Sequence, residues 1–139
     1  MVEIREMTTQ DYQQAYALWE SVPGMHLSSL DNSFAGIARV IAANPTLCLV
    51  AVAQGEVVAT ALGATDGRKG YLYHVAVAKK QRGQGLAKTL VHTITARLKH
   101  RKINKLGLFV VADNQAGQEF WVHQGFKERA DIKYLDLDL

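Results

Sequence analysis

The chain has 139 residues, a length that predicts one domain over residues 1–139. Of these residues 48% are hydrophobic and 21% are charged, a composition that can form a buried core and that excludes a disordered chain. Sixteen Lys and Arg against thirteen Asp and Glu give a formal charge of +3, a mild excess that suits an anionic small molecule at least as well as a polynucleotide. The single cysteine, Cys48, excludes an internal disulfide and fits a cytoplasmic protein, and no apolar run approaches the roughly 20 residues that a membrane-spanning helix needs.

The first third of the chain predicts one strand and two helices. Val2–Glu6 alternates apolar and charged residues, as a half-buried strand does. A capping-box pattern that opens at Thr8 starts the first helix. The second helix stops at Asn44-Pro45, because the residue before a proline is pushed out of the helical conformation. We expect Trp19 and Phe34, one on each helix, to lie in the core.

The middle of the chain predicts three strands and a long helix. Leu47–Ala53 is a continuous apolar run, typical of a strand covered on both faces. Glu56–Leu62 is its hairpin partner, and Tyr71–Val77 is the third strand. From Gly85 to about His100 the apolar residues recur with the period of a helix.

The last third predicts a strand at Leu106–Val111 and a helix at Asn114–Gln124. Gly125 is placed to end this helix in the left-handed conformation, with Phe126 making the hydrophobic contact of such a cap. Tyr134–Leu139 alternates cleanly and predicts a half-exposed edge strand. The order of elements predicts an α/β fold, a mixed sheet of antiparallel hairpins with one β-α-β crossover.

The most informative stretch is the glycine-rich turn between the third strand and the long helix. The basic residues Lys79, Lys80 and Arg82 precede Gly83 and Gly85. Glycine lets a ligand approach the backbone without an obstructing Cβ. The first amides of a helix have no internal partners and point outward at the positive end of its dipole. The turn therefore predicts an anion site.

Two widespread phosphate-binding motifs do not fit this turn, because Ala87 and Lys88 stand where the P-loop and the dinucleotide fingerprint need glycine. Arg82-x-x-Gly85-x-Ala87 instead matches the Arg/Gln-x-x-Gly-x-Gly/Ala signature of the GNAT superfamily of acyl-CoA-dependent N-acyltransferases. The chain resembles that family over nearly its full length. The resemblance implies a mixed, mostly antiparallel central sheet with flanking helices and a splayed central pair of strands.

The resemblance also implies a site for acetyl-CoA as co-substrate. The amides of the turn would hold the pyrophosphate, and the strand ending at Val77 would pair with the pantetheine arm as though the arm were an added strand. Asn114 matches an asparagine that often contacts the arm, a role that is compatible with a plain helix N-cap. The residues implied at this site are Val75, Ala76, Val77, Arg82, Gly83, Gln84, Gly85, Leu86, Ala87 and Asn114.

The implied reaction is the transfer of an acetyl group to a primary amine of a small molecule or peptide, by direct attack in a ternary complex. Family members often protonate the leaving thiolate from a tyrosine at the position of Trp121, which has no acidic proton to give, so we expect proximity and orientation to supply most of the rate. His74 and Tyr73 are the candidate catalytic residues, and strand alternation predicts that they face opposite sides of the sheet. The structural alternatives are a packed histidine and an ordinary core aromatic.

For the acceptor pocket we expect the connection Pro23–Asp31, with its small and polar residues, and the turn Thr65–Gly70. Asp31 or Asp66 would attract a cationic amine. Scattered histidines and one cysteine do not suggest a metal site.

Two other functions are open at this point. A non-catalytic module that binds acyl-CoA is compatible with Trp121. A basic nucleic-acid-binding domain would show a steep salt dependence of affinity. We favour the enzyme, and we expect no nucleic acid and no membrane as partners. The predicted edge strand at Tyr134–Leu139 makes a homodimer possible.

Overall fold

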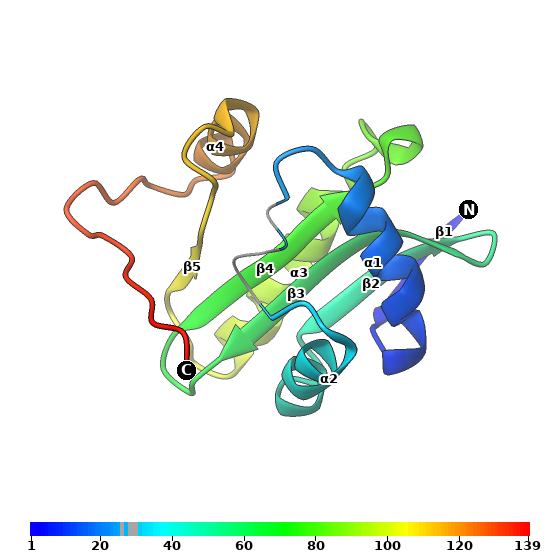
Figure 1. Cartoon of the computed structure of the whole chain (residues 1–139), viewed down its shortest axis with the longest axis horizontal. Coiled ribbons are helices and arrows are strands. Elements are labelled where there is room, and N and C mark those ends of the chain that lie inside the picture. The colour runs from blue at the N-terminus through cyan, green and yellow to red at the C-terminus, as the bar shows by residue number, and fades with distance from the viewer. Residues whose placement is uncertain (26, 28–30) are drawn as a thin grey trace.

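Five strands form one sheet in the order β1-β2-β3-β4-β5, in a computed structural model that describes residues 1–25, 27 and 31–139 (Figure 1). Neighbours among the first four strands are antiparallel, and β5 runs parallel to β4. The mixed, mostly antiparallel sheet predicted from the sequence is therefore confirmed. The strands are β1 (Val2–Glu6), β2 (Cys48–Ala53), β3 (Glu56–Thr65), β4 (Gly70–Val77) and β5 (Leu106–Leu108).

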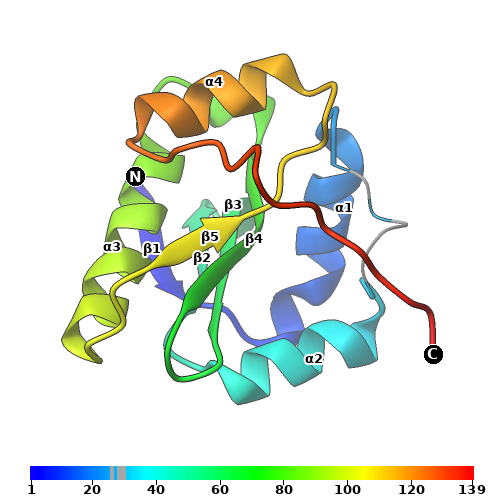
Figure 2. The same ribbon diagram turned by 90° about the vertical axis from the view of Figure 1, so that its left-hand side faces the viewer.

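Helices cover both faces of this sheet. Figure 2 shows α3 on one side and α1 with α2 on the other, while α4 lies beyond the end of β5. The core is correspondingly in two parts, with Leu90 and Ile94 of α3 in one buried cluster and Trp19 and Ile37 of α1 and α2 in the other. The helices are α1 (Tyr12–Ser21), α2 (Phe34–Ala43), α3 (Leu86–His100) and α4 (Gln115–His123), with short 3-10 turns η1 (Thr9–Asp11) and η3 (Lys79–Gln81).

Local signals in the sequence set the helix ends. The Asp11 carboxylate accepts the Thr8 N–H at 2.9 Å, as the capping-box pattern predicts. At the end of α4, Gly125 has φ +101°, and the Phe126 N–H donates to the Trp121 carbonyl at 3.0 Å. The Phe126 ring packs on Trp121 with centroids 5.2 Å apart. The predicted left-handed glycine cap is therefore confirmed.

Three predictions about elements and core are wrong. The segment Tyr134–Leu139 is no strand, and Leu135, Leu137 and Leu139 are all exposed. Alternation specifies which face a strand buries, but a strand also needs a hydrogen-bonded neighbour, and this segment pairs with no strand in the described part of the chain. β5 ends at Leu108 and not at Val111, since its ladder with β4 stops there. Phe34 is 53% exposed, whereas Trp19 is fully buried as expected.

Within the described residues, no helix combines the length and apolarity that crossing a bilayer would require.

Candidate functional site

The parallel strands β4 and β5 separate soon after they meet. Their ladder runs from the pair Gly70–Leu106 to the pair Leu72–Leu108, while β4 continues to Val77, and Figure 1 shows the two strands diverging. The Ala78 N–H bonds back to Val58 of β3, so the alternation of an antiparallel ladder turns the main-chain groups of the preceding residue, Val77, away from β3. The splayed strand pair expected from the resemblance is present, with strand backbone facing the gap.

The glycine-rich turn lies at the end of β4 and faces solvent. Gly83 and Gly85 have φ of +83° and +75°, and a Cβ built on either would meet nothing within 4 Å. The first backbone bond of α3 runs from the Thr89 N–H to the Gly85 carbonyl at 2.9 Å. Within the described part of the chain, the amides of residues 83–88 donate no hydrogen bond to the protein. These amides are therefore open to a ligand, as the sequence predicts.

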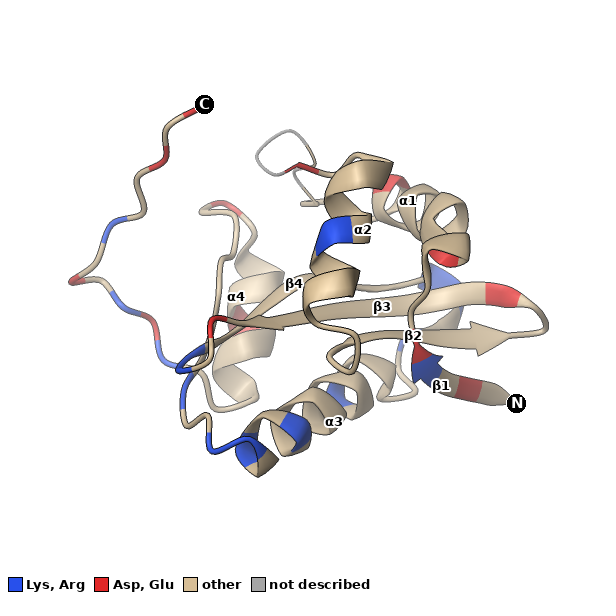
Figure 3. Ribbon diagram, turned by 90° about the horizontal axis from the view of Figure 1, so that it is seen from below, with Lys and Arg blue, Asp and Glu red and all other residues tan. Residues whose placement is uncertain are grey.

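Cationic side chains surround this turn. Lys79, Lys80, Arg82 and Lys88 are exposed, and the Arg82 guanidinium reaches back to the Val77 carbonyl through Nε at 3.2 Å. Further Lys and Arg residues follow along α3 and the connection to β5 (Figure 3). An anion at the turn would meet both the dipole of a 15-residue helix and mobile positive charge.

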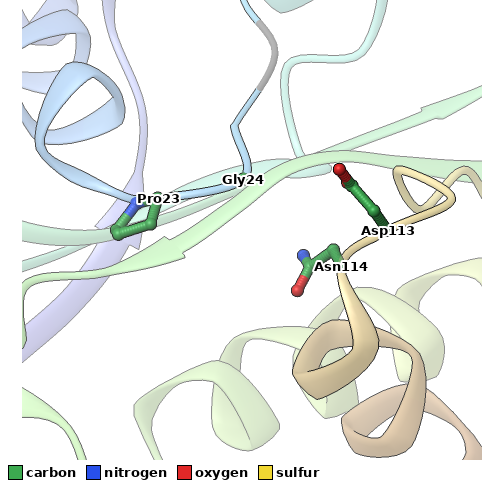
Figure 4. Close-up of a pocket in the computed structure, with 4 residues that line it drawn as sticks. All are labelled: Pro23, Gly24, Asp113 and Asn114. Atoms are coloured by element: carbon green, nitrogen blue, oxygen red, sulfur yellow. The ribbon is translucent and has the colours of Figure 1, made fainter.

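A cleft of about 330 Å³ opens between the end of α1 and the start of α4, lined by Pro23, Gly24, Asp113 and Asn114 (Figure 4). The Asn114 side chain caps α4 by accepting the Gly117 N–H at 3.0 Å, which confirms the predicted N-cap. Gly24 has φ +84°, and a Cβ there would lie 3.1 Å from Asn114 Nδ2, so glycine permits the close approach of the two segments. Sequence reasoning did not single out Asp113, whose only signal is its place beside the cap.

A β-bulge interrupts β4 opposite β3. The register shifts between Thr60 and Leu62, and His74 takes the left-handed φ of +52°. The extra residue breaks strand alternation, so the prediction that Tyr73 and His74 face opposite sides is wrong. Tyr73 packs against the core cluster that contains Trp19, and the His74 ring lies on Trp19 itself with centroids 4.3 Å apart.

The His74 side chain is held in its neutral form. Its Nε2 lies 2.6 Å from Oδ1 of Asn32, while Nδ1 is buried and has no partner among the described residues. Asn32 Nδ2 donates to the Leu27 carbonyl, which leaves Oδ1 as the acceptor and places the imidazole hydrogen on Nε2. Burial lowers the pKa of His74 to about 4, so the imidazole is a weak base at neutral pH.

Two buried polar groups that the sequence analysis overlooked surround this histidine. Asn32 is 6% exposed, and its backbone carbonyl accepts the Tyr12 hydroxyl at 2.6 Å. Thr60 is fully buried; its hydroxyl accepts Trp19 Nε1 at 2.9 Å and donates to the His74 carbonyl at 2.7 Å. These contacts join residues far apart in the chain, which local patterns do not show.

The Tyr73 side chain lies half-buried at the other side of the bulge. Its ring stacks on Tyr71 with centroids 6.4 Å apart, and burial raises the pKa of its hydroxyl. That hydroxyl makes no hydrogen bond to any residue the structure describes. Phe109 and Tyr134 pack against each other nearby, at 4.9 Å between centroids. Tyr73 is thus protonated at neutral pH and able to donate a hydrogen bond.

The expected acceptor pocket is only partly assembled as predicted. Asp66 builds the hairpin turn by accepting two backbone N–H groups, and Asp31 accepts from Ser33 and Arg39. The turn Thr65–Gly70 does not line the cleft. From the connection Pro23–Asp31, the first two residues line the cleft, and Met25 and Leu27 pack on the α1–α2 core. The residues His26, Ser28, Ser29 and Leu30 lie outside the described part of the chain.

Trp121 is not placed to donate a proton. It packs between Phe120 and Phe126 and against the core beneath α3, and its indole has no acidic hydrogen. Of the predicted site residues, the glycine turn follows the end of β4, Asn114 lines the cleft opposite Gly24, and His74 lies in a buried network with Asn32 and Thr60.

A splayed parallel pair beside an open glycine turn is the architecture of the acetyltransferase (GNAT) family, whose model matches residues 3–126. The chain belongs to this family and is an acetyltransferase of it.

One sequence relative and two solved structures illustrate what this chain is similar to. The acetyltransferase plu1384 of Photorhabdus laumondii subsp. laumondii is 34% identical over an alignment of 119 residues, and the match covers 83% of this chain and 79% of the relative. The structure of Ard1 from Thermoplasma volcanium shares the fold with a TM-score of 0.80 at 20% identity, over 93% of this chain and 84% of that one. A predicted acetyltransferase from Clostridium acetobutylicum, solved with acetyl-CoA, has a TM-score of 0.74 at 20% identity, over 98% and 96% of the two chains.

Proposed function

We propose that this acetyltransferase moves an acetyl group from acetyl-CoA to a primary amine of a small molecule or peptide, by direct attack within a ternary complex. The observation that carries the proposal is the solvent-facing turn whose amides, at residues 83–88, have no partner among the described residues and open beside the gap between β4 and β5. The relative from Clostridium acetobutylicum contains acetyl-CoA in the same fold.

In this proposal the chain binds acetyl-CoA mainly with its backbone. The amides from Gly83 to Ala87 hold the pyrophosphate. The Arg82 N–H already donates to the Lys79 carbonyl at 3.3 Å, so Arg82 contributes the charge of its side chain. The pantetheine arm pairs with the main chain of Val75 and Val77, whose strand has lost its neighbour on that side. The main-chain groups of Ala76, between them, face its partner Thr60 of β3. Asn114 stands at the cleft, where its amide meets the arm.

The amine must lose a proton before it attacks the thioester. For a lysine-like amine this costs about 5 kcal/mol at pH 7. His74 is unsuited to accept that proton directly, because it is buried, neutral and bonded to Asn32. Water in the cleft, with Asp113 at its rim, is the remaining acceptor, and orientation supplies most of the rate.

The reaction also develops negative charge on the tetrahedral oxyanion and on the leaving thiolate. The amide of Val75 donates to the tetrahedral oxyanion, because the Ala76 amide faces Thr60 of β3. The CoA thiol, with a pKa of about 8.5, leaves with a proton from water or from the Tyr73 hydroxyl, which makes no bond to the described residues. Trp121 takes no part in proton transfer.

The test is ligand binding followed by turnover. CoA at about 100 times its Kd should stabilise the protein by about 2.7 kcal/mol, measured as a rise in Tm. Acetyl-CoA with a panel of amines and peptides should then release free thiol. A protein that CoA does not stabilise contradicts the whole proposal, whereas binding without thiol release from any amine identifies a non-catalytic acyl-CoA-binding module.

A further inference from the structure

One buried side chain connects three elements around the bulge. Asn32, just before α2, accepts from His74 of β4 at 2.6 Å and donates to the Leu27 carbonyl, while its own carbonyl receives the Tyr12 hydroxyl of α1. Asn32 is 6% exposed, so little water competes for these hydrogen bonds. Leu27 and the residue before α2 are thereby tied to β4.

The histidine on the other side of this bond is itself fixed. Its carbonyl accepts the Thr60 hydroxyl, and its ring lies against Trp19, whose indole donates to the same hydroxyl. A residue with a side chain at φ +52° in the middle of a strand costs about 1–2 kcal/mol, and it persists where the surroundings determine it completely. His74 is thus a rigid point to which the connection is attached.

The same connection reaches the cleft at its other end. Pro23 and Gly24 line the cleft opposite Asp113 and Asn114. Met25 and Leu27 pack on the α1–α2 core, between the cleft and Asn32 along the chain. Because Asn32 Nδ2 donates to the Leu27 carbonyl, a shift at Asn32 acts directly on Leu27, three residues from Gly24 at the wall of the cleft.

We propose that Asn32 is a positioning residue, which links the Leu27 carbonyl to His74 of β4 and so shapes the side of the cleft that Pro23 and Gly24 form. The inference rests on the function proposed above, and it places the amine beside Pro23 and Gly24 of that cleft. It assigns Asn32 and His74 to acceptor binding and leaves acetyl-CoA binding to the turn and to the gap.

Two single variants and their combination test the pair. Asn32→Ala removes the bond from one side. His74→Asn removes it from the other and keeps the backbone, because asparagine tolerates a left-handed φ and is too short to reach Asn32. Each should lower kcat/KM for the amine about tenfold through a higher KM, with the KM for acetyl-CoA within about twofold of the wild type. The kcat/KM of the double variant for the amine should be no lower than that of the more impaired single variant, because the two residues act as a unit.

The matched control is Asn104→Ala, which removes an exposed asparagine between α3 and β5 and should leave both KM values unchanged. Suppose that the wild-type protein is active. If both variants then keep its kcat/KM for the amine, or if their KM for acetyl-CoA rises as much as their KM for the amine, the inference is wrong and the proposed function stands. Wild-type protein that transfers acetyl to no amine overturns the proposed function, and the inference with it.

A readout without turnover is the NMR titration of His74. Asn32→Asp keeps an acceptor beside Nε2 and makes it a carboxylate, which favours the imidazolium and should raise the His74 pKa from about 4 by one unit or more. A merely space-filling Asn32 predicts an unchanged titration, and that result contradicts the contact on which the inference depends.

Discussion

Among single residues, His74 is the one whose ionisation should affect stability. Burial against Trp19 lowers its pKa to about 4, and no charged side chain faces it among the described residues. The unfolded chain takes up a proton near pH 6.5, before the folded protein does, so stability is complete above that pH and falls as the pH drops from about 6.5 to about 4. We expect His74 to account for at most about 3 kcal/mol of this loss.

Urea unfolding across that pH window measures the effect. His74→Asn lacks the buried imidazole of residue 74, so its free energy of unfolding should fall less steeply with decreasing pH than that of the wild type. His92→Asn, which changes an exposed histidine of α3, should keep the wild-type slope. Equal slopes for all three proteins would mean that His74 ionises freely in the folded state.

Single residues also mark the limit of what the sequence predicts. Gly85, Asn114 and Gly125 were placed correctly because their roles depend on neighbours a few residues away. His74 was placed on the wrong side of the sheet relative to Tyr73, since alternation assumes a regular strand and the bulge adds a residue. Asn32 was missed because its partners lie on other elements.

Among the elements, the turn before α3 carries the most testable geometry. Gly85 and Gly55 both have a left-handed φ, of +75° and +78°, and open space around the position of a Cβ. Alanine at either site costs a similar backbone strain, about 1–2 kcal/mol. Only Gly85 lies where we place the pyrophosphate, so Gly85→Ala should weaken CoA binding at least about tenfold beyond Gly55→Ala, the matched control in the β2–β3 turn.

Isothermal titration of CoA into the two folded variants decides this prediction. Similar affinities for both would show that a methyl group at Gly85 does not meet the ligand, and the pyrophosphate would have to bind elsewhere.

Whole elements were predicted best where local chemistry limits them at both ends. The first strand was predicted with its observed bounds, and the third helix to within a residue. Tyr134–Leu139 shows the opposite case, because its alternation contains no information on which edge would accept its hydrogen bonds. The early end of β5 has the same origin, since divergence from β4 is a property of the pair of strands and not of one sequence segment.

At the scale of the whole molecule, the sheet is a middle layer between two separate cores, and the gap opens where β4 and β5 diverge. The apolar run of β2 was expected to be covered on both faces, and it supplies Leu49 and Ala51 to the cluster under α3 and Cys48 and Val50 to the cluster under α1 and α2. Because α3 also carries the glycine turn at its start, its packing on the sheet fixes where the open amides point.

The packing of α3 on the sheet can be tested by one substitution that shortens a buried side chain. Ile94 is fully buried, and a Cβ on Gly63 of β3 would lie 2.8 Å from its Cγ2. Ile94→Ala should therefore leave a cavity and lower the free energy of unfolding by about 2–5 kcal/mol, seen as a lower urea midpoint with an unchanged m-value. Val122→Ala, at a position 59% exposed on α4, should stay within about 0.5 kcal/mol of the wild type. CoA should still stabilise the folded Ile94→Ala protein, because the substitution leaves the amides of residues 83–88 in place. A loss at Ile94 no larger than that at Val122 would mean that α3 does not pack on the sheet at this point.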